Sequence, residues 1–144
     1  PKLLERASYP LNKIAPTLRV NSGLTIDMAT RNADVREMDV NDTLYITKVS
    51  VRWFRELHQT INLAFEDIKK VQDVPLLVMQ GGDDKIVNKV PVKQWFNKAP
   101  FTEKRFKEWP KCYHEIFNEP EREDVFDYAK DFVMSSLRSI GYIV

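Results

Sequence analysis

The sequence predicts an α/β fold in which parallel strands have helices on their flanks, preceded by a mostly helical segment. Two observations predict the parallel strands. A continuous apolar run over residues 75–80 ends at a pair of glycines, and a second strand-like segment at 104–109 follows a helical pattern at 90–99. An amphipathic pattern then closes the chain. Parallel strands need a crossover connection, usually a helix, so the order strand, helix, strand, helix is typical of them.

The first 47 residues carry only weak signals. Pro10 and Pro16 interrupt the first apolar cluster, so we expect irregular structure there. Asn21-Ser22-Gly23 predicts a turn, and one short helix is expected within residues 28–40. The first strong pattern is a helix over residues 50–71, in which Ser50 is the expected N-cap.

Each element of the second half has its own signal. The run at 75–80 is apolar at nearly every position, which predicts a strand buried on both faces. Residues 104–109 alternate charged and apolar side chains, the period of a half-exposed strand. For the last helix we expect a start at Asn118, with Pro120 in its first turn, and an end at Gly141.

The composition excludes several classes of protein. The chain has 144 residues with 22 Lys+Arg against 21 Asp+Glu, so charge alone does not hold it to nucleic acid. One cysteine, Cys112, excludes an internal disulfide framework and a zinc site built on cysteines, and we expect it to be a small packed residue. Because neither a signal peptide nor a membrane-spanning run is visible, we expect a cytoplasmic protein.

Two loops hold the candidate chemistry. Asp84 follows the first predicted strand and His114 follows the second, and α/β proteins place their sites at the carboxyl ends of parallel strands. A carboxylate beside a histidine fixes its tautomer and stabilises the imidazolium. Spacing alone leaves a second interpretation open, in which Asp84 caps a turn and His114 is exposed. The other histidine, His58, is interpreted as a polar residue at the edge of its helix.

The run VPLLVMQGGDDKIV, followed by YHEIFNEPERE and an amphipathic last helix, resembles the C-terminal half of α/β-hydrolases. The branch that it resembles contains monoacylglycerol lipases, lysophospholipases and other serine aminopeptidase S33-like hydrolases. The resemblance implies that Asp84 is the acid and His114 the base of a catalytic triad, and that Asp83 is only a neighbour. It also implies a helical cap over residues 1–72 and part of the hydrolase core over 73–144.

The nucleophile that the resemblance calls for is absent. No Gly-x-Ser-x-Gly motif occurs, and the chain begins at Pro1 without a methionine. We therefore expect a fragment that is inactive by itself and lacks an upstream half. A half sheet leaves an unpaired strand edge, so the expected partner is the N-terminal half of the same fold, as in a nicked chain, or a second copy in a homodimer.

The expected reaction is hydrolysis of a lipid-like carboxylic ester, with no metal and no organic cofactor. Trp53, Phe54 and Leu57 in the cap, with Val87 beside Asp84, are the candidate substrate-binding residues, although packing against the core explains the cap residues equally well. We expect transient contact of the cap with a membrane surface. Peptide or haloalkane hydrolysis stays open, as does a non-catalytic binding module that retains a hydrolase half-fold.

Overall fold

The computed structural model describes residues 2–142, and the chain divides into two compact units. One unit comprises the chain up to residue 24 together with residues 43–71. The other comprises residues 25–42 and the chain from residue 72 onward. The predicted cap over 1–72 and core over 73–144 stay a prediction, because this division describes packing and not the role of either part.

Two helices and a short strand pair build the first unit. Helix α1 (Lys2–Ile14) packs against α3 (Val51–Glu66), and β1 (Arg19–Asn21) pairs antiparallel with β2 (Lys48–Ser50). The Ser50 side chain accepts a hydrogen bond from the Trp53 backbone N–H at 3.1 Å, which confirms the predicted N-cap. The helix is shorter than predicted, because its last turn tightens into a 3₁₀ segment, η2 (Asp67–Lys70).

The prediction of irregular structure before residue 47 is wrong for α1 and for β1. This helix contains Pro10, which cannot donate the usual backbone hydrogen bond. Contacts with α3 offset that loss: the Arg55 guanidinium lies 3.5 Å from the centre of the Tyr9 ring, and Ser8 is buried. Tertiary packing therefore overrides the local signal of the proline.

The second unit begins with residues 25–42, a segment that belongs to the predicted cap and not to the predicted core. It contains the 3₁₀ turn η1 (Ile26–Met28) and helix α2 (Ala33–Val40). The short helix predicted within 28–40 is thus confirmed, and it starts at an N-cap, Asn32, whose side chain accepts from the Asp34 N–H at 3.1 Å.

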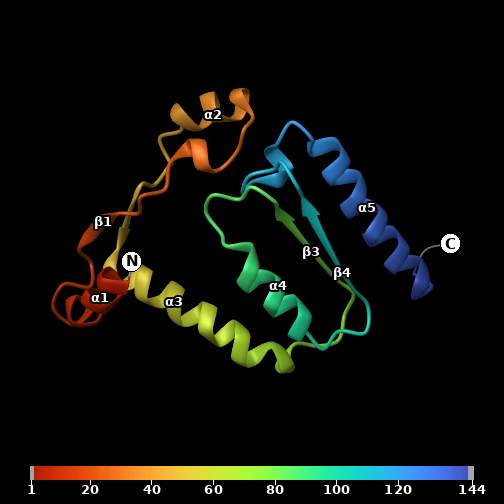
Figure 1. Ribbon diagram of the computed structural model, residues 1–144, viewed down its shortest axis with the longest axis horizontal. Coiled ribbons are helices and arrows are strands. Elements are labelled where there is room, and N and C mark those ends of the chain that lie inside the picture. The colour runs from red at the N-terminus through yellow and green to blue at the C-terminus, as the bar shows by residue number, and fades with distance from the viewer. Residues whose placement is uncertain (1, 143–144) are drawn as a thin grey trace. The chain divides into compact units, whose positions relative to one another are not determined.

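The predicted parallel arrangement is confirmed. Strand β3 (Leu76–Gly81) pairs in parallel with β4 (Lys104–Trp109), and α4 (Lys89–Lys98) makes the crossover between them. Both strands lie between α4 and α5 (Arg122–Ser139) and point toward the same edge (Figure 1). Within residues 2–142 this sheet has two strands. No helix of the described part is long and apolar enough to cross a membrane.

Two expectations about the second unit are wrong in detail. Residues 76–79 of β3 are partly exposed rather than buried on both faces, because a sheet of two strands does not cover them. The last helix begins at Arg122, since Ile116–Asn118 form a separate 3₁₀ turn, η3, and Pro120 precedes α5. Gly141 follows the end of α5 with φ +72°, as predicted for a helix terminator.

Candidate active site

The structure brings Asp84 and His114 together at the carboxyl ends of the two parallel strands. Asp84 Oδ2 and His114 Nδ1 are 3.0 Å apart. The aspartate side chain is 3% exposed, whereas the histidine side chain is 40% exposed. The acid is therefore buried behind a base that solvent or a substrate can reach.

Four donors surround the Asp84 carboxylate. Its Oδ1 accepts from the backbone N–H groups of Ile86 and Val87, at 2.8 and 2.9 Å. Its Oδ2 accepts from Gln80 Nε2 at 2.7 Å in addition to His114. These contacts fix the orientation of the carboxylate, which leaves Oδ2 facing the imidazole.

Gln80 is the contact that the sequence analysis missed. It is buried at the end of β3, within a run whose other members from residue 75 are apolar. A polar side chain at the buried end of a strand needs a hydrogen-bond partner. A glutamine at the end of an apolar run was therefore the signal in the sequence that could have identified this contact. The partner of Gln80 is the oxygen that also contacts His114.

Opposing effects act on the Asp84 carboxyl. Burial raises its pKa, but hydrogen bonds from the Val87 backbone, from His114 and from the Ile86 backbone outweigh burial, so the pKa lies below its ordinary value. Asp84 is therefore ionised at neutral pH and can only accept hydrogen bonds. The Nδ1 atom of His114 must then carry the proton of the shared hydrogen bond, so in the neutral imidazole Nε2 is the nitrogen with the free lone pair.

Two glycines allow the loop that carries Asp84 and the loop that carries His114 to approach each other closely. A Cβ atom at Gly81 would lie 2.0 Å from the Tyr113 carbonyl oxygen, and one at Gly82 would lie 2.7 Å from Pro110 Cα. The Asp83 N–H also donates to the Cys112 carbonyl oxygen at 3.1 Å. The backbone that leads to Asp84 and the backbone that leads to His114 are thus in direct contact.

The predicted substrate-binding residues fall in both compact units. Val87 is 37% exposed and lines a cavity of about 420 Å³ together with Asp84. Phe54 lines a separate cavity of about 690 Å³ inside the first unit, whose apolar walls also include Leu11, Val20, Val49 and Val51. Trp53 and Leu57 lie on the same helix, are 49% and 40% exposed, and do not line that cavity.

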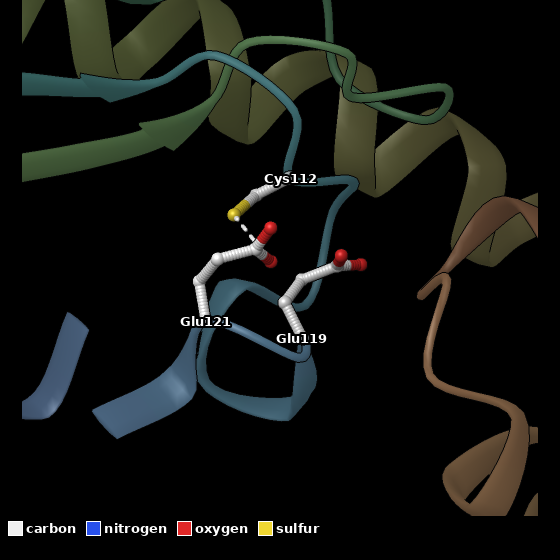
Figure 2. A group of neighbouring side chains, drawn as sticks. All are labelled: Cys112, Glu119 and Glu121. Atoms are coloured by element: carbon white, nitrogen blue, oxygen red, sulfur yellow. Dashed lines mark hydrogen bonds between the residues drawn. The ribbon is translucent and has the colours of Figure 1, made fainter. Parts of the chain in front are cut away.

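One further group of side chains has the composition of a metal site. Ligand atoms of Cys112, Glu119 and Glu121 lie within 4.8 Å of one another (Figure 2). Both carboxylates, however, already accept hydrogen bonds from Arg31. Burial, and after it the neighbouring carboxylates, raises the pKa of the Cys112 thiol to about 11, so in the metal-free chain this thiol is protonated at neutral pH. We therefore assign no metal to this group.

A family model described as serine aminopeptidase, S33 matches residues 1–121. The chain belongs to this hydrolase family. Phospholipase YtpA of Bacillus subtilis (strain 168) is 59% identical over 131 residues, which are 91% of this chain and 51% of that protein. The monoacylglycerol lipase of Mycolicibacterium smegmatis is 32% identical over 63 residues, which are 44% of this chain and 22% of that protein.

Solved structures show the same fold. A soluble variant of monoglyceride lipase from Saccharomyces cerevisiae, in complex with a substrate analog, superimposes with a TM-score of 0.80 at 23% identity, covering 94% of this chain and 50% of that one. The monoacylglycerol lipase of Paleococcus ferrophilus gives 0.78 at 22% identity, covering 94% and 53%. These findings confirm the predicted branch of α/β-hydrolases, and the chain spans about half the length of these two lipases and of the phospholipase.

Proposed function

We propose that this chain supplies the acid and the base of a serine hydrolase that cleaves lipid-like carboxylic esters, of lysophospholipase or monoacylglycerol lipase type. The observation that carries the proposal is the contact of 3.0 Å between Asp84 Oδ2 and His114 Nδ1, at the carboxyl edge of a parallel strand pair. Relatives named as a phospholipase and a monoacylglycerol lipase support the substrate class.

In the proposed reaction, the nucleophile is a serine outside this chain. It lies on the N-terminal half of the same fold, which is the proposed partner of this chain. His114 Nε2 takes the serine proton as the serine oxygen attacks the ester carbonyl, and then returns the proton to the departing alcohol. A water molecule cleaves the acyl-enzyme with the same base. Asp84 keeps the imidazole in the tautomer with Nδ1 protonated and stabilises its charged form, and no cofactor takes part.

The cavity in the first unit supports a lipid-like substrate. It has a volume of about 690 Å³, and Leu11, Val20, Val49, Val51 and Phe54 give it apolar walls. Such a volume with mostly apolar walls suits an acyl chain. We assign acyl binding to this unit, with Phe54 in the wall and with Trp53 and Leu57 beside it on α3.

The site also bears on the alternative of a non-catalytic binding module. A module that only binds has no use for a buried, ionised carboxylate held by four donors behind an accessible imidazole. The arrangement around Asp84 therefore favours catalysis over that alternative.

Replacing Asp84 by Asn in the protein expressed from its complete gene tests the proposal. The carboxamide keeps the shape but turns a donor toward Gln80 and His114, so we expect kcat for a monoacylglycerol or lysophospholipid to fall on the order of 10⁴-fold. D83N is the matched control, because the Asp83 side chain is exposed, and it should keep full activity. Equal activity of the two variants would remove Asp84 from the mechanism.

A further inference from the structure

The loop that carries His114 is held by a segment remote from it in the sequence. The Glu115 N–H donates to the Ala29 carbonyl oxygen at 2.9 Å, and the Thr30 hydroxyl donates to the Asn118 carbonyl oxygen at 3.3 Å. Thr30 is fully buried. Between the end of β4 and the start of α5 the loop has only a single 3₁₀ turn, η3, so these contacts stand in for regular structure.

Glu119 adds a buried ion pair with Arg31 to these contacts. Its side chain is completely buried, and both of its oxygens accept from one residue: Oε1 from the Arg31 backbone N–H at 2.9 Å, and Oε2 from Arg31 Nε at 2.7 Å. A buried carboxylate that is paired in this way fixes the backbone and the side chain of its partner together. The other end of the guanidinium donates to Glu121, which is 35% exposed.

The arrangement of the acidic side chains fits one guanidinium between them. Glu119 and Glu121 extend from the turn that precedes α5 toward the loop of Cys112 (Figure 2). The Arg31 guanidinium donates to both carboxyl groups. The pKa of the Glu121 carboxyl is lowered, first of all by its hydrogen bond with Arg31, so the outer carboxylate is ionised at neutral pH.

We infer that Arg31 is a positioning residue for His114. Through Glu119 and Glu121 it ties the loop that carries the base to residues 29–31, and so sets where the imidazole stands against Asp84. The inference rests on the proposed function and deepens it, because the triad geometry depends on an ion pair that touches neither Asp84 nor His114. The segment 25–42 lies in the sequence between the two parts of the other unit.

Replacing Arg31 by Lys in the protein expressed from its complete gene tests the inference. Lysine keeps the charge but loses the fork that joins both carboxylates. R36K is the matched control, because Arg36 pairs with Asp27 at 3.2 Å on the surface of the same segment. Two quantities are measured: the rate of labelling by a fluorophosphonate, and the low-field proton resonance of the His114 Nδ1–H group that donates to Asp84.

We expect the rate at which folded R31K reacts with the fluorophosphonate to be lower by a factor of about ten or more. Small misplacements of catalytic groups lower reaction rates by factors of this order. Its His114 resonance should move upfield or broaden, and R36K should match the parent protein in both measurements. A lower melting temperature of R31K with unchanged labelling and resonance would make the ion pair merely structural and overturn the inference.

If R31K does not fold, E121Q decides the question, because it removes the charge of the outer, partly exposed partner and leaves the buried pair of Arg31 with Glu119 in place. Glu121 Oε2 also accepts a hydrogen bond from Cys112 Sγ at 3.9 Å. E121Q should change both readouts in the same direction by a smaller amount, and unchanged readouts overturn the inference. Failure of the proposed function is visible separately. If the parent protein does not react with the probe, the proposed hydrolase function is contradicted. If the R31K substitution still shifts the His114 resonance in that case, Arg31 remains the positioning residue of His114.

Discussion

At the scale of single residues, the Asp84 carboxylate depends on a neighbour that the sequence did not reveal. Gln80→Met removes the donor at 2.7 Å from Oδ2 and leaves His114 as the remaining side-chain contact of that oxygen in the described structure. A hydrogen bond to a charged group contributes about 1.5–3 kcal/mol. Because part of this fixes the carboxylate against the imidazole, we expect kcat to fall about tenfold, measured with a monoacylglycerol or lysophospholipid.

The control for this prediction is Gln94→Met, which makes the same change at an exposed position of α4. It should leave kcat unchanged. A Q80M protein with full activity would show that the two backbone N–H groups of Ile86 and Val87 hold Asp84 without help from Gln80.

At the scale of elements, the contact between the end of β3 and the loop after β4 depends on Gly81. In Gly81→Ala the new Cβ would stand 2.0 Å from the Tyr113 carbonyl oxygen and 2.6 Å from that of Cys112, and backbone atoms do not move aside cheaply. We expect a loss of about 3 kcal/mol or more in the free energy of unfolding. Activity should fall with it because the two loops separate, and denaturant unfolding and ester hydrolysis measure the two effects.

Gly23→Ala separates this steric effect from the general cost of replacing a glycine. An added Cβ there meets nothing within 4 Å, but the backbone has φ +75°. The variant should lose only about 1–2 kcal/mol of stability and keep its activity. If G81A resembled G23A in both measurements, close approach at β3 would not be what holds the loops together.

At the scale of the whole molecule, the proposed acyl binding in one compact unit and the proposed catalysis in the other predict a separable effect on substrate length. Phe54→Ala opens the wall of the cavity of about 690 Å³, so kcat/KM for a dodecanoyl ester should fall about tenfold, whereas an acetate ester should react normally. Trp53→Ala should show the same preference more weakly, since Trp53 does not line the cavity. Ile61→Ala, at an exposed position of α3, is the control. Equal losses on both esters would contradict acyl binding in this unit.

Local patterns determined most elements of this chain. The apolar run before two glycines, the alternation at 104–109 and the cap at Ser50 each depend on neighbours in the sequence. Both strands formed where they were expected, and the helix began at its predicted cap. The pairing of β3 with β4 followed from the crossover rule. The positions of Asp84 and His114 followed as well, since the carboxyl ends of parallel strands meet at one edge.

Tertiary contacts decided what local patterns could not. Helix α1 continues through Pro10 because it packs on α3, and residues 29–31 join the second unit through the buried Glu119, which requires a partner that Arg31 supplies. Gln80 gained its place in the site in the same way. In each case a distant group outweighs the local preference, since a buried polar or charged atom must be satisfied wherever the chain can reach it. The sequence by itself therefore determined the elements and the candidate acid and base, whereas the tertiary structure decided what holds them in place.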